Sequence, residues 1–101
     1  MFSRQVYQSI RQQAKLDPFV EICGYIKGDS VFQCNNISEQ PKYNFLINPV
    51  EIFDKNPECI YHSHPSASSK PSRFDIISQR EMQIPFLIYS LRDDDFYFLK
   101  K

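Results

Sequence analysis

A chain of 101 residues has room for one domain, and with 42% hydrophobic residues it can bury a core without disulfide cross-links. Its formal charge of zero provides no basic surface for nucleic acid or for an anionic membrane, so we expect neither as a partner. No apolar run approaches the ~18–20 residues that cross a bilayer, and the N-terminus has no signal-peptide core. We therefore expect a soluble, cytoplasmic protein that forms a single domain over residues 1–101.

The first element is predicted to be an amphipathic helix over residues 3–16. Apolar side chains recur there at helical spacing among Gln, Arg and Lys, and Ser3 is a suitable N-cap. Asp17 and Pro18 then end the pattern. The polar face has only modest basic content, so we expect the apolar stripe to pack on a sheet rather than on a membrane.

A β-hairpin is predicted next, and its first strand contains a single charged residue. Residues 19–26 are otherwise nearly all apolar, which favours a strand buried on both faces, and turn residues join it to a second strand over residues 31–37. The charged residue is Glu21. Burying an unpaired carboxylate costs several kcal/mol, so Glu21 must have a partner, face a cleft or hold a proton. Composition alone favours a solvent-exposed Glu at a strand end.

The middle of the chain is predicted to contain a short strand, a helix and a further strand. Residues 45–47 are apolar and indicate the short strand. The helix begins with Asn48 as N-cap and Pro49 at its first position. Residues 59–62 form the next predicted strand, which ends in a histidine.

The last part of the chain is predicted to form a helix and a second hairpin. Ser72 and Asp75 have the spacing of a capping box, which predicts a helix N-terminus, although an Asp75 side chain turned toward the interior should not also bond fully to the Ser72 amide. Residues 85–91 and 96–99 read as strands joined by a charged turn. Together the elements predict an α/β domain with a central mixed sheet of about six strands flanked by about three helices.

The only two histidines of the chain are separated by one residue. If the strand over residues 59–62 continues, the side chains of His62 and His64 point to the same face and reach one ion. Asp75 comes from a different element and can add an oxygen ligand, which leaves a fourth tetrahedral position for water, as in catalytic zinc sites. A bare His-x-His pattern is weak evidence, however, because such histidines are more often solvated.

The residues around the histidines make the pattern more specific. The sequence His-Ser-His-Pro from His62, then six residues, then Ser-x-x-Asp ending at Asp75, with Glu21 upstream, resembles the zinc signature of the JAMM (JAB/MPN) metalloproteases. The resemblance extends over nearly the whole chain. It implies a JAMM/MPN-type fold in which His62, His64 and Asp75 bind one zinc ion. It also implies that Glu21 is the general acid/base and that Ser72 helps to hold the tetrahedral intermediate.

The same resemblance implies an activity. Members of this family are zinc-dependent peptidases or isopeptidases, and their substrates include proteins joined to a ubiquitin-like protein. The Glu-x-Cys-Gly sequence from Glu21 and the Phe-Leu-Ile-Asn-Pro sequence at residues 45–49 look like the JAMM domain of phage tail-assembly proteins. A phage tail component is therefore a second expected kind of partner.

Two other classes of function stay open from the sequence. The first is a non-catalytic MPN-type binding or assembly module that keeps the zinc site. The second is a structural zinc domain, which normally has four protein ligands, whereas the motif supplies three, namely His62, His64 and Asp75.

The cysteines offer a further alternative, a thiol nucleophile. Cys23, Cys34 and Cys59 are odd in number and lack C-x-x-C spacing, so we expect reduced, buried thiols. Activation of Cys59 by His62 is disfavoured, because residues three apart on a strand point to opposite faces.

Overall fold

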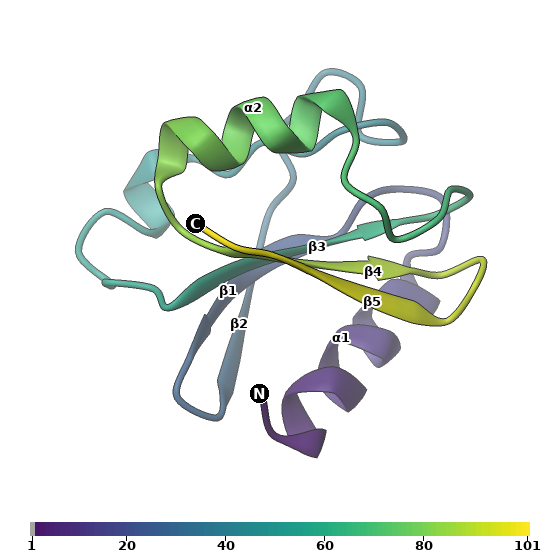
Figure 1. The fold of residues 1–101 in the computed structure, drawn as a ribbon, viewed down its shortest axis with the longest axis horizontal. Coiled ribbons are helices and arrows are strands. Elements are labelled where there is room, and N and C mark those ends of the chain that lie inside the picture. The colour runs from purple at the N-terminus through teal and green to yellow at the C-terminus, as the bar shows by residue number, and fades with distance from the viewer. Residues whose placement is uncertain (1) are drawn as a thin grey trace.

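The computed structural model describes residues 2–101, which form a five-stranded mixed sheet between two α-helices (Figure 1). In chain order the elements are α1 (Arg4–Leu16), β1 (Cys23–Lys27), β2 (Ser30–Cys34), the 3-10 turn η1 (Pro49–Glu51), β3 (Cys59–His64), α2 (Arg73–Met82), β4 (Phe86–Ser90) and β5 (Asp95–Leu99). The predicted α/β class is confirmed, with five strands instead of about six and two α-helices instead of about three helices. Met1, part of the predicted domain, lies outside the described residues.

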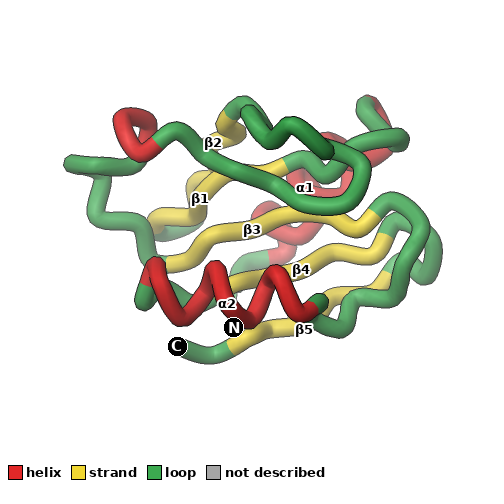
Figure 2. Tube along the Cα trace, turned by 90° about the horizontal axis from the view of Figure 1, so that it is seen from above, coloured by secondary structure: helices red, strands yellow, loops and turns green. Residues whose placement is uncertain are grey.

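The sheet has the strand order β2-β1-β3-β4-β5, as Figure 2 shows from above. Among the described strands, β3 and β4 are parallel and the other neighbours are antiparallel. Parallel neighbours need a crossover connection, and α2 supplies it. All six residues of β3 are buried, as expected for a central strand with both faces covered.

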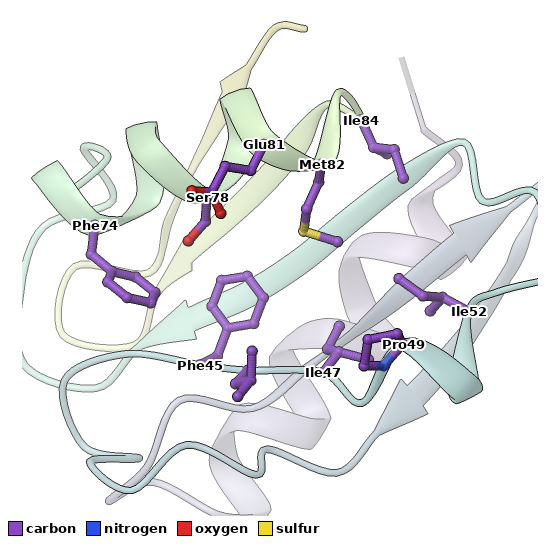
Figure 3. A pocket seen from close by; sticks show the side chains of 10 residues that line it. Phe45, Ile47, Pro49, Ile52, Phe74, Ser78, Glu81, Met82 and Ile84 are labelled. Carbon is purple, nitrogen blue, oxygen red and sulfur yellow. The ribbon is translucent and has the colours of Figure 1, made fainter.

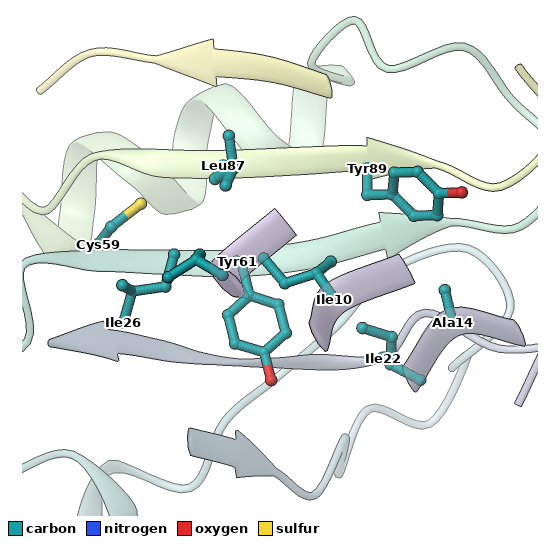
Figure 4. Packing of buried hydrophobic residues seen from close by; sticks show 9 residues of the cluster. Ile10, Ala14, Ile22, Ile26, Cys59, Tyr61, Leu87 and Tyr89 are labelled. Atoms are coloured by element: carbon teal, nitrogen blue, oxygen red, sulfur yellow. The ribbon is translucent and has the colours of Figure 1, made fainter. Parts of the chain in front are cut away.

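Helix α1 covers one face of the sheet, and α2 lies over the other (Figure 1). Val6, Ile10 and Ala14 recur every four residues along α1 and are buried, so one stripe of this helix faces the sheet. The cluster beneath it includes Tyr61 and Leu87 from the two central strands (Figure 4). The predicted helix and its Ser3 cap are confirmed, since the Ser3 side chain accepts a hydrogen bond from the Val6 amide. Neither helix combines the length and apolar character that a membrane span requires.

The segment before η1 differs from its prediction. Phe45 and Ile47 are buried and Leu46 is 52% exposed, which is the alternation of a strand, but the segment pairs with no strand of the described sheet. Its role is to cover the sheet face with its apolar side chains rather than to extend the sheet. The predicted cap at Asn48 is correct, although the helix it begins is a single 3-10 turn.

Gly24 occupies a position where the sheet has no room for a side chain. A Cβ atom there would lie 2.2 Å from the Phe32 carbonyl oxygen and 2.6 Å from the Tyr61 hydroxyl oxygen. The carbonyl belongs to the backbone of a paired strand and cannot rotate away. We expect Gly24→Ala to lower the free energy of unfolding by about 3 kcal/mol, measured by urea denaturation.

The second glycine gives a control for this prediction. Gly28 has a φ of +60° in the β1–β2 turn, with no atom within 4 Å of the added Cβ. Its replacement by Ala should cost only about 1 kcal/mol, from the left-handed backbone alone. Equal losses for the two variants would contradict the close approach at Gly24.

Candidate metal centre

The end of β3 and the first turn of α2 bring the three predicted ligands together. His62 Nε2 lies 3.0 Å from Asp75 Oδ1, and His64 Nε2 lies 2.9 Å from Asp75 Oδ2. One nitrogen from each imidazole and one carboxylate oxygen all lie within 4.8 Å of one another, and all three residues are buried. The group could therefore hold a metal ion.

The second ring nitrogen of His64 has a fixed partner. Nδ1 lies 2.7 Å from the carbonyl oxygen of Ser68. Because a carbonyl oxygen can only accept a hydrogen bond, Nδ1 carries the proton and donates it. In neutral His64 this leaves a lone pair on Nε2, the nitrogen that faces Asp75. A hydrogen bond from the far ring nitrogen to a carbonyl is the usual arrangement for a metal-binding histidine.

His62 is held in an apolar setting. Its ring stacks on Phe45 with 4.3 Å between ring centroids and meets the edge of Phe86 at 5.7 Å. Burial lowers the pKa of His62, which favours the neutral imidazole. Within residues 2–101, neither ring nitrogen has a hydrogen-bond partner of good geometry, although Nε2 points at Asp75. A cation between the nitrogen and the carboxylate would satisfy both, so the residues fit a bound metal.

Asp75 makes two sets of contacts that were expected to conflict. Its Oδ2 atom accepts a hydrogen bond of 2.9 Å from the Ser72 amide, and its own amide donates to Ser72 Oγ, which completes the capping box. The same carboxylate still faces His62 and His64, so the expected conflict is wrong. Burial raises the pKa of Asp75, but the two imidazole rings that face its oxygens, together with the Ser72 amide, outweigh burial and hold that pKa well below its usual range. The carboxylate is therefore charged at neutral pH.

Glu21 lies in an irregular segment just before β1, not within a strand as predicted. The regular ladder with β3 ends at Cys23, opposite His62. One residue earlier, the Ile22 amide donates to the hydroxyl of Ser63 at 3.0 Å, while the Ser63 amide donates to the Ile22 carbonyl at 3.0 Å. A side-chain oxygen thus takes the place of a backbone acceptor in the ladder. The chain leaves the sheet at this point and carries Glu21 to the cleft.

The Glu21 carboxyl is buried, and one of its oxygens lacks a hydrogen bond that would offset the cost of burial. The residue is 4% exposed, and its Oε1 atom has no hydrogen-bond partner among the described residues. Burial raises the pKa of Glu21 to about 8, with His64 opposing and Asp75 adding to the shift. Glu21, His64 and Ser72 line one small cleft of ≈ 110 Å³. The two residues predicted to assist catalysis therefore lie at the same hollow as a predicted ligand.

This carboxyl should make the metal-free protein less stable as pH rises. In the unfolded chain Glu21 ionises near pH 4.5, whereas in the folded chain it keeps its proton up to about pH 8. The protein therefore has its full stability with respect to this group below about pH 4.5, and it loses that contribution as the pH rises toward 8. We expect Glu21→Gln to stabilise the chelated protein at pH 8 by a few kcal/mol and to have little effect near pH 4.5, measured by urea unfolding. The exposed Glu39→Gln is the control, and an equal gain there would refute this explanation.

A separate apolar groove lies beside the centre, between α2 and the segment that contains Phe45 (Figure 3). It encloses ≈ 340 Å³ and is lined by side chains such as Ile47, Phe74 and Met82. None of the three predicted ligands lines it. Phe45 separates the two sites, since one side of the ring faces the groove and the ring also stacks on His62.

The thiol alternative does not fit the structure. Cys59 belongs to the cluster beneath α1, with Tyr61, on the face of β3 opposite to His62. Burial raises the pKa of Cys59 to about 12, so the thiolate is not formed at neutral pH. Cys23, Cys34 and Cys59 are all free and buried, as predicted.

Loss of a bound metal should leave the domain folded. Nine buried residues form the cluster beneath α1, and none of them is a predicted ligand. Catalytic sites differ in this respect from structural zinc sites, whose metal provides the folding energy. We expect circular dichroism of the chelated protein to show cooperative thermal unfolding. A non-cooperative transition would favour the structural-zinc alternative.

Comparison with known proteins decides the family. A sequence profile of prokaryotic homologs of the JAB domain matches residues 3–99. The chain belongs to this family. Protein DSY2949 from Desulfitobacterium hafniense, determined in solution, is 21% identical with a TM-score of 0.73, covering 99% of this chain and 84% of the other. At that identity the likeness shows the fold alone, and a search among curated proteins found no significant match.

In this prokaryotic JAB domain, several residues that hold the site were not found from the sequence. Phe45 was predicted to lie in a strand, and the sequence predicts no role for Ser68. The contribution of Ser68 is a backbone carbonyl, which leaves no signal in the residue type. The position of Ser63 between the two histidines was a usable signal, because a hydroxyl there can replace a ladder acceptor.

Proposed function

We propose that this JAB domain is a zinc-dependent peptidase or isopeptidase that hydrolyses an amide bond by means of a metal-activated water. The observation that carries the proposal is the position of Glu21. A buried carboxyl with a raised pKa, whose Oε1 atom has no hydrogen-bond partner within residues 2–101, lines the same cleft as the predicted ligand His64. Perturbed carboxyl groups in clefts are typical of general acid/base catalysts.

The donor set fits zinc. His62, His64 and Asp75 offer two imidazole nitrogens and one carboxylate oxygen, and three protein ligands are the arrangement of catalytic zinc. One zinc ion held by these residues would supply a Lewis acid and a water of lowered pKa at its remaining position. The Ser68 carbonyl fixes the ring of His64, and the stacked ring of Phe45 keeps bulk water from His62.

The remaining chemistry belongs to two side chains. Glu21 takes the proton of the attacking water at its carboxylate and delivers it to the leaving amine. Its pKa of about 8 without a cation falls when positive charge is bound nearby, so the carboxylate is available near neutral pH. The Ser72 hydroxyl accepts the Asp75 amide hydrogen bond, and its own hydrogen is free to donate to the developing oxyanion.

The proposed substrate is an extended stretch of protein chain. A cleft of ≈ 110 Å³ admits a narrow backbone segment and not a folded element. A peptide, the tail of a ubiquitin-like protein or a segment of a phage tail component would each meet this requirement. We propose the cytoplasm as the compartment, on the basis of the composition.

The test is cleavage of peptide and ubiquitin-like fusion substrates by the purified chain, with and without a chelator, alongside capture of bound proteins by Glu21→Gln. Cleavage that stops on chelation and returns with zinc supports the proposal. A parent that binds metal and partner but cleaves nothing would favour the non-catalytic assembly module.

A further inference from the structure

One side chain outside the predicted site joins Glu21 to the loop opposite. The Asn36 amide nitrogen donates to the Glu21 carbonyl at 2.9 Å and to the Asn44 carbonyl at 3.1 Å. Its Oδ1 atom accepts from the Ser38 amide at 3.0 Å and from the Leu46 amide at 3.1 Å. A primary amide has two donor hydrogens and two acceptor lone pairs, so Asn36 uses its full capacity.

Three of these four bonds reach the two segments that shape the metal centre, and the fourth closes the turn at Ser38. On one side, Glu21 is held at both peptide groups, because its amide also donates to the Pro41 carbonyl at 2.7 Å. On the other side, the bonded groups of Asn44 and Leu46 flank Phe45, whose ring stacks on His62. Asn36 therefore ties the backbone of Glu21 to the backbone on either side of Phe45, whose ring covers His62.

The need for such a tie follows from the irregular backbone at Glu21. The regular ladder between β1 and β3 ends at Cys23, and beyond the two bonds between Ile22 and Ser63 no strand pairing fixes the chain at Glu21. The Glu21 carboxyl is buried, its Oε1 atom has no hydrogen-bond partner among the described residues, and ionisation favours its movement toward water. Hydrogen bonds to the main chain of Glu21 must oppose that movement.

We propose that Asn36 is a positioning residue, which holds Glu21 in the cleft by bonding its main chain to the loop that carries Phe45. The catalytic consequence rests on the proposed function of Glu21. A misplacement of about 1 Å can reduce a catalysed rate by roughly 10²-fold, so loss of this bond should be visible in turnover.

Asn36 also shapes its own loop, and Asn36→Asp separates the two roles. The two bonds accepted by Oδ1 serve the turn toward Ser38 and Leu46, and Asp keeps an acceptor at that place. The Nδ2 bonds to Glu21 and Asn44 are lost, and a carboxylate oxygen instead faces two carbonyl oxygens. The variant therefore breaks the link between Glu21 and Asn44 and leaves the acceptor side of Asn36 in place.

The experiment compares Asn36→Asp with Asn35→Asp in the zinc-loaded protein. Asn35 is the exposed neighbour, so its replacement introduces the same charge one residue away. For Asn36→Asp we expect kcat to fall by roughly 10- to 100-fold, with KM and zinc content within about twofold of the parent. Hydrogen exchange of the Glu21 amide should be at least about tenfold faster, while the amides of β3 keep their protection. Asn35→Asp should match the parent in every measurement.

Several results would overturn the inference. They are an unchanged kcat together with unchanged exchange at Glu21, a loss that appears only in KM or zinc content, and a loss of protection throughout β3. Asn36→Ala removes the same links without adding charge, so it should reproduce the fall in kcat, and failure to do so would assign the effect of Asp to charge alone. If the parent cleaves nothing, or if Glu21→Gln is fully active, the proposed function fails, and exchange at Glu21 alone then decides the role of Asn36.

Discussion

Replacement of Glu21 by Gln is expected to lower kcat by about 10²- to 10⁴-fold while zinc content and fold are preserved. Gln has nearly the same shape but cannot accept and return a proton. Glu21 is 4% exposed and is not one of the three grouped ligands, so the substitution should disturb neither the surface nor the metal. Parallel measurement of zinc content and of substrate cleavage in variant and parent tests this expectation.

Two further variants provide reference values for the fall in kcat of Glu21→Gln. Ser72→Ala should lower kcat less, by roughly 10- to 10³-fold, because one donor to the oxyanion is lost while the metal stays. It also removes the N-cap of α2, so the assay must be run well below its unfolding temperature. Glu39→Gln, at an exposed loop position, should be fully active. A Glu21→Gln protein as active as the parent would refute the assigned mechanism.

Asp75→Asn is expected to weaken zinc binding by more than about 100-fold and to abolish cleavage. Asn has a similar size, but it removes the negative charge and one of the two oxygens that face His62 and His64. Its remaining oxygen can still accept from the Ser72 amide, so α2 should stay capped. Competition titration with a zinc indicator measures the affinity, and circular dichroism checks the helix.

The matched control is Asp29→Asn, in the exposed turn between β1 and β2. This variant loses the same charge far from the centre in sequence and should bind zinc as tightly as the parent. Unchanged affinity in Asp75→Asn would remove Asp75 from the ligand set. It would leave only two of the three grouped residues to bind the metal.

Local patterns were sufficient for much of this structure. The helix at α1, its Ser3 cap and both hairpins follow from apolar periodicity and turn residues. The convergence of His62, His64 and Asp75 was also predictable, because strand alternation and a motif of fixed spacing place them on one side.

The missed features depend on partners that are distant in the sequence. Phe45 and Ile47 alternate with Leu46 as they would in a strand, and only the absence of a neighbouring strand among the described residues excludes it. The early end of β1 depends on the hydroxyl of Ser63, which is 41 positions away from Ile22. Asn36 falls within the predicted second strand over residues 31–37, but β2 ends at Cys34, and the role of Asn36 becomes visible only in its bonds to Glu21 and beyond.

Zinc titration of the metal-free protein, with cleavage followed at each addition, tests whether the metal centre is catalytic. We expect activity to rise in proportion to added zinc and to saturate at one equivalent per chain, because His62, His64 and Asp75 form one site. Glu21→Gln should bind the same equivalent without gaining activity. Cleavage that is independent of zinc, or a Glu21→Gln protein that zinc activates as fully as the parent, would contradict this expectation.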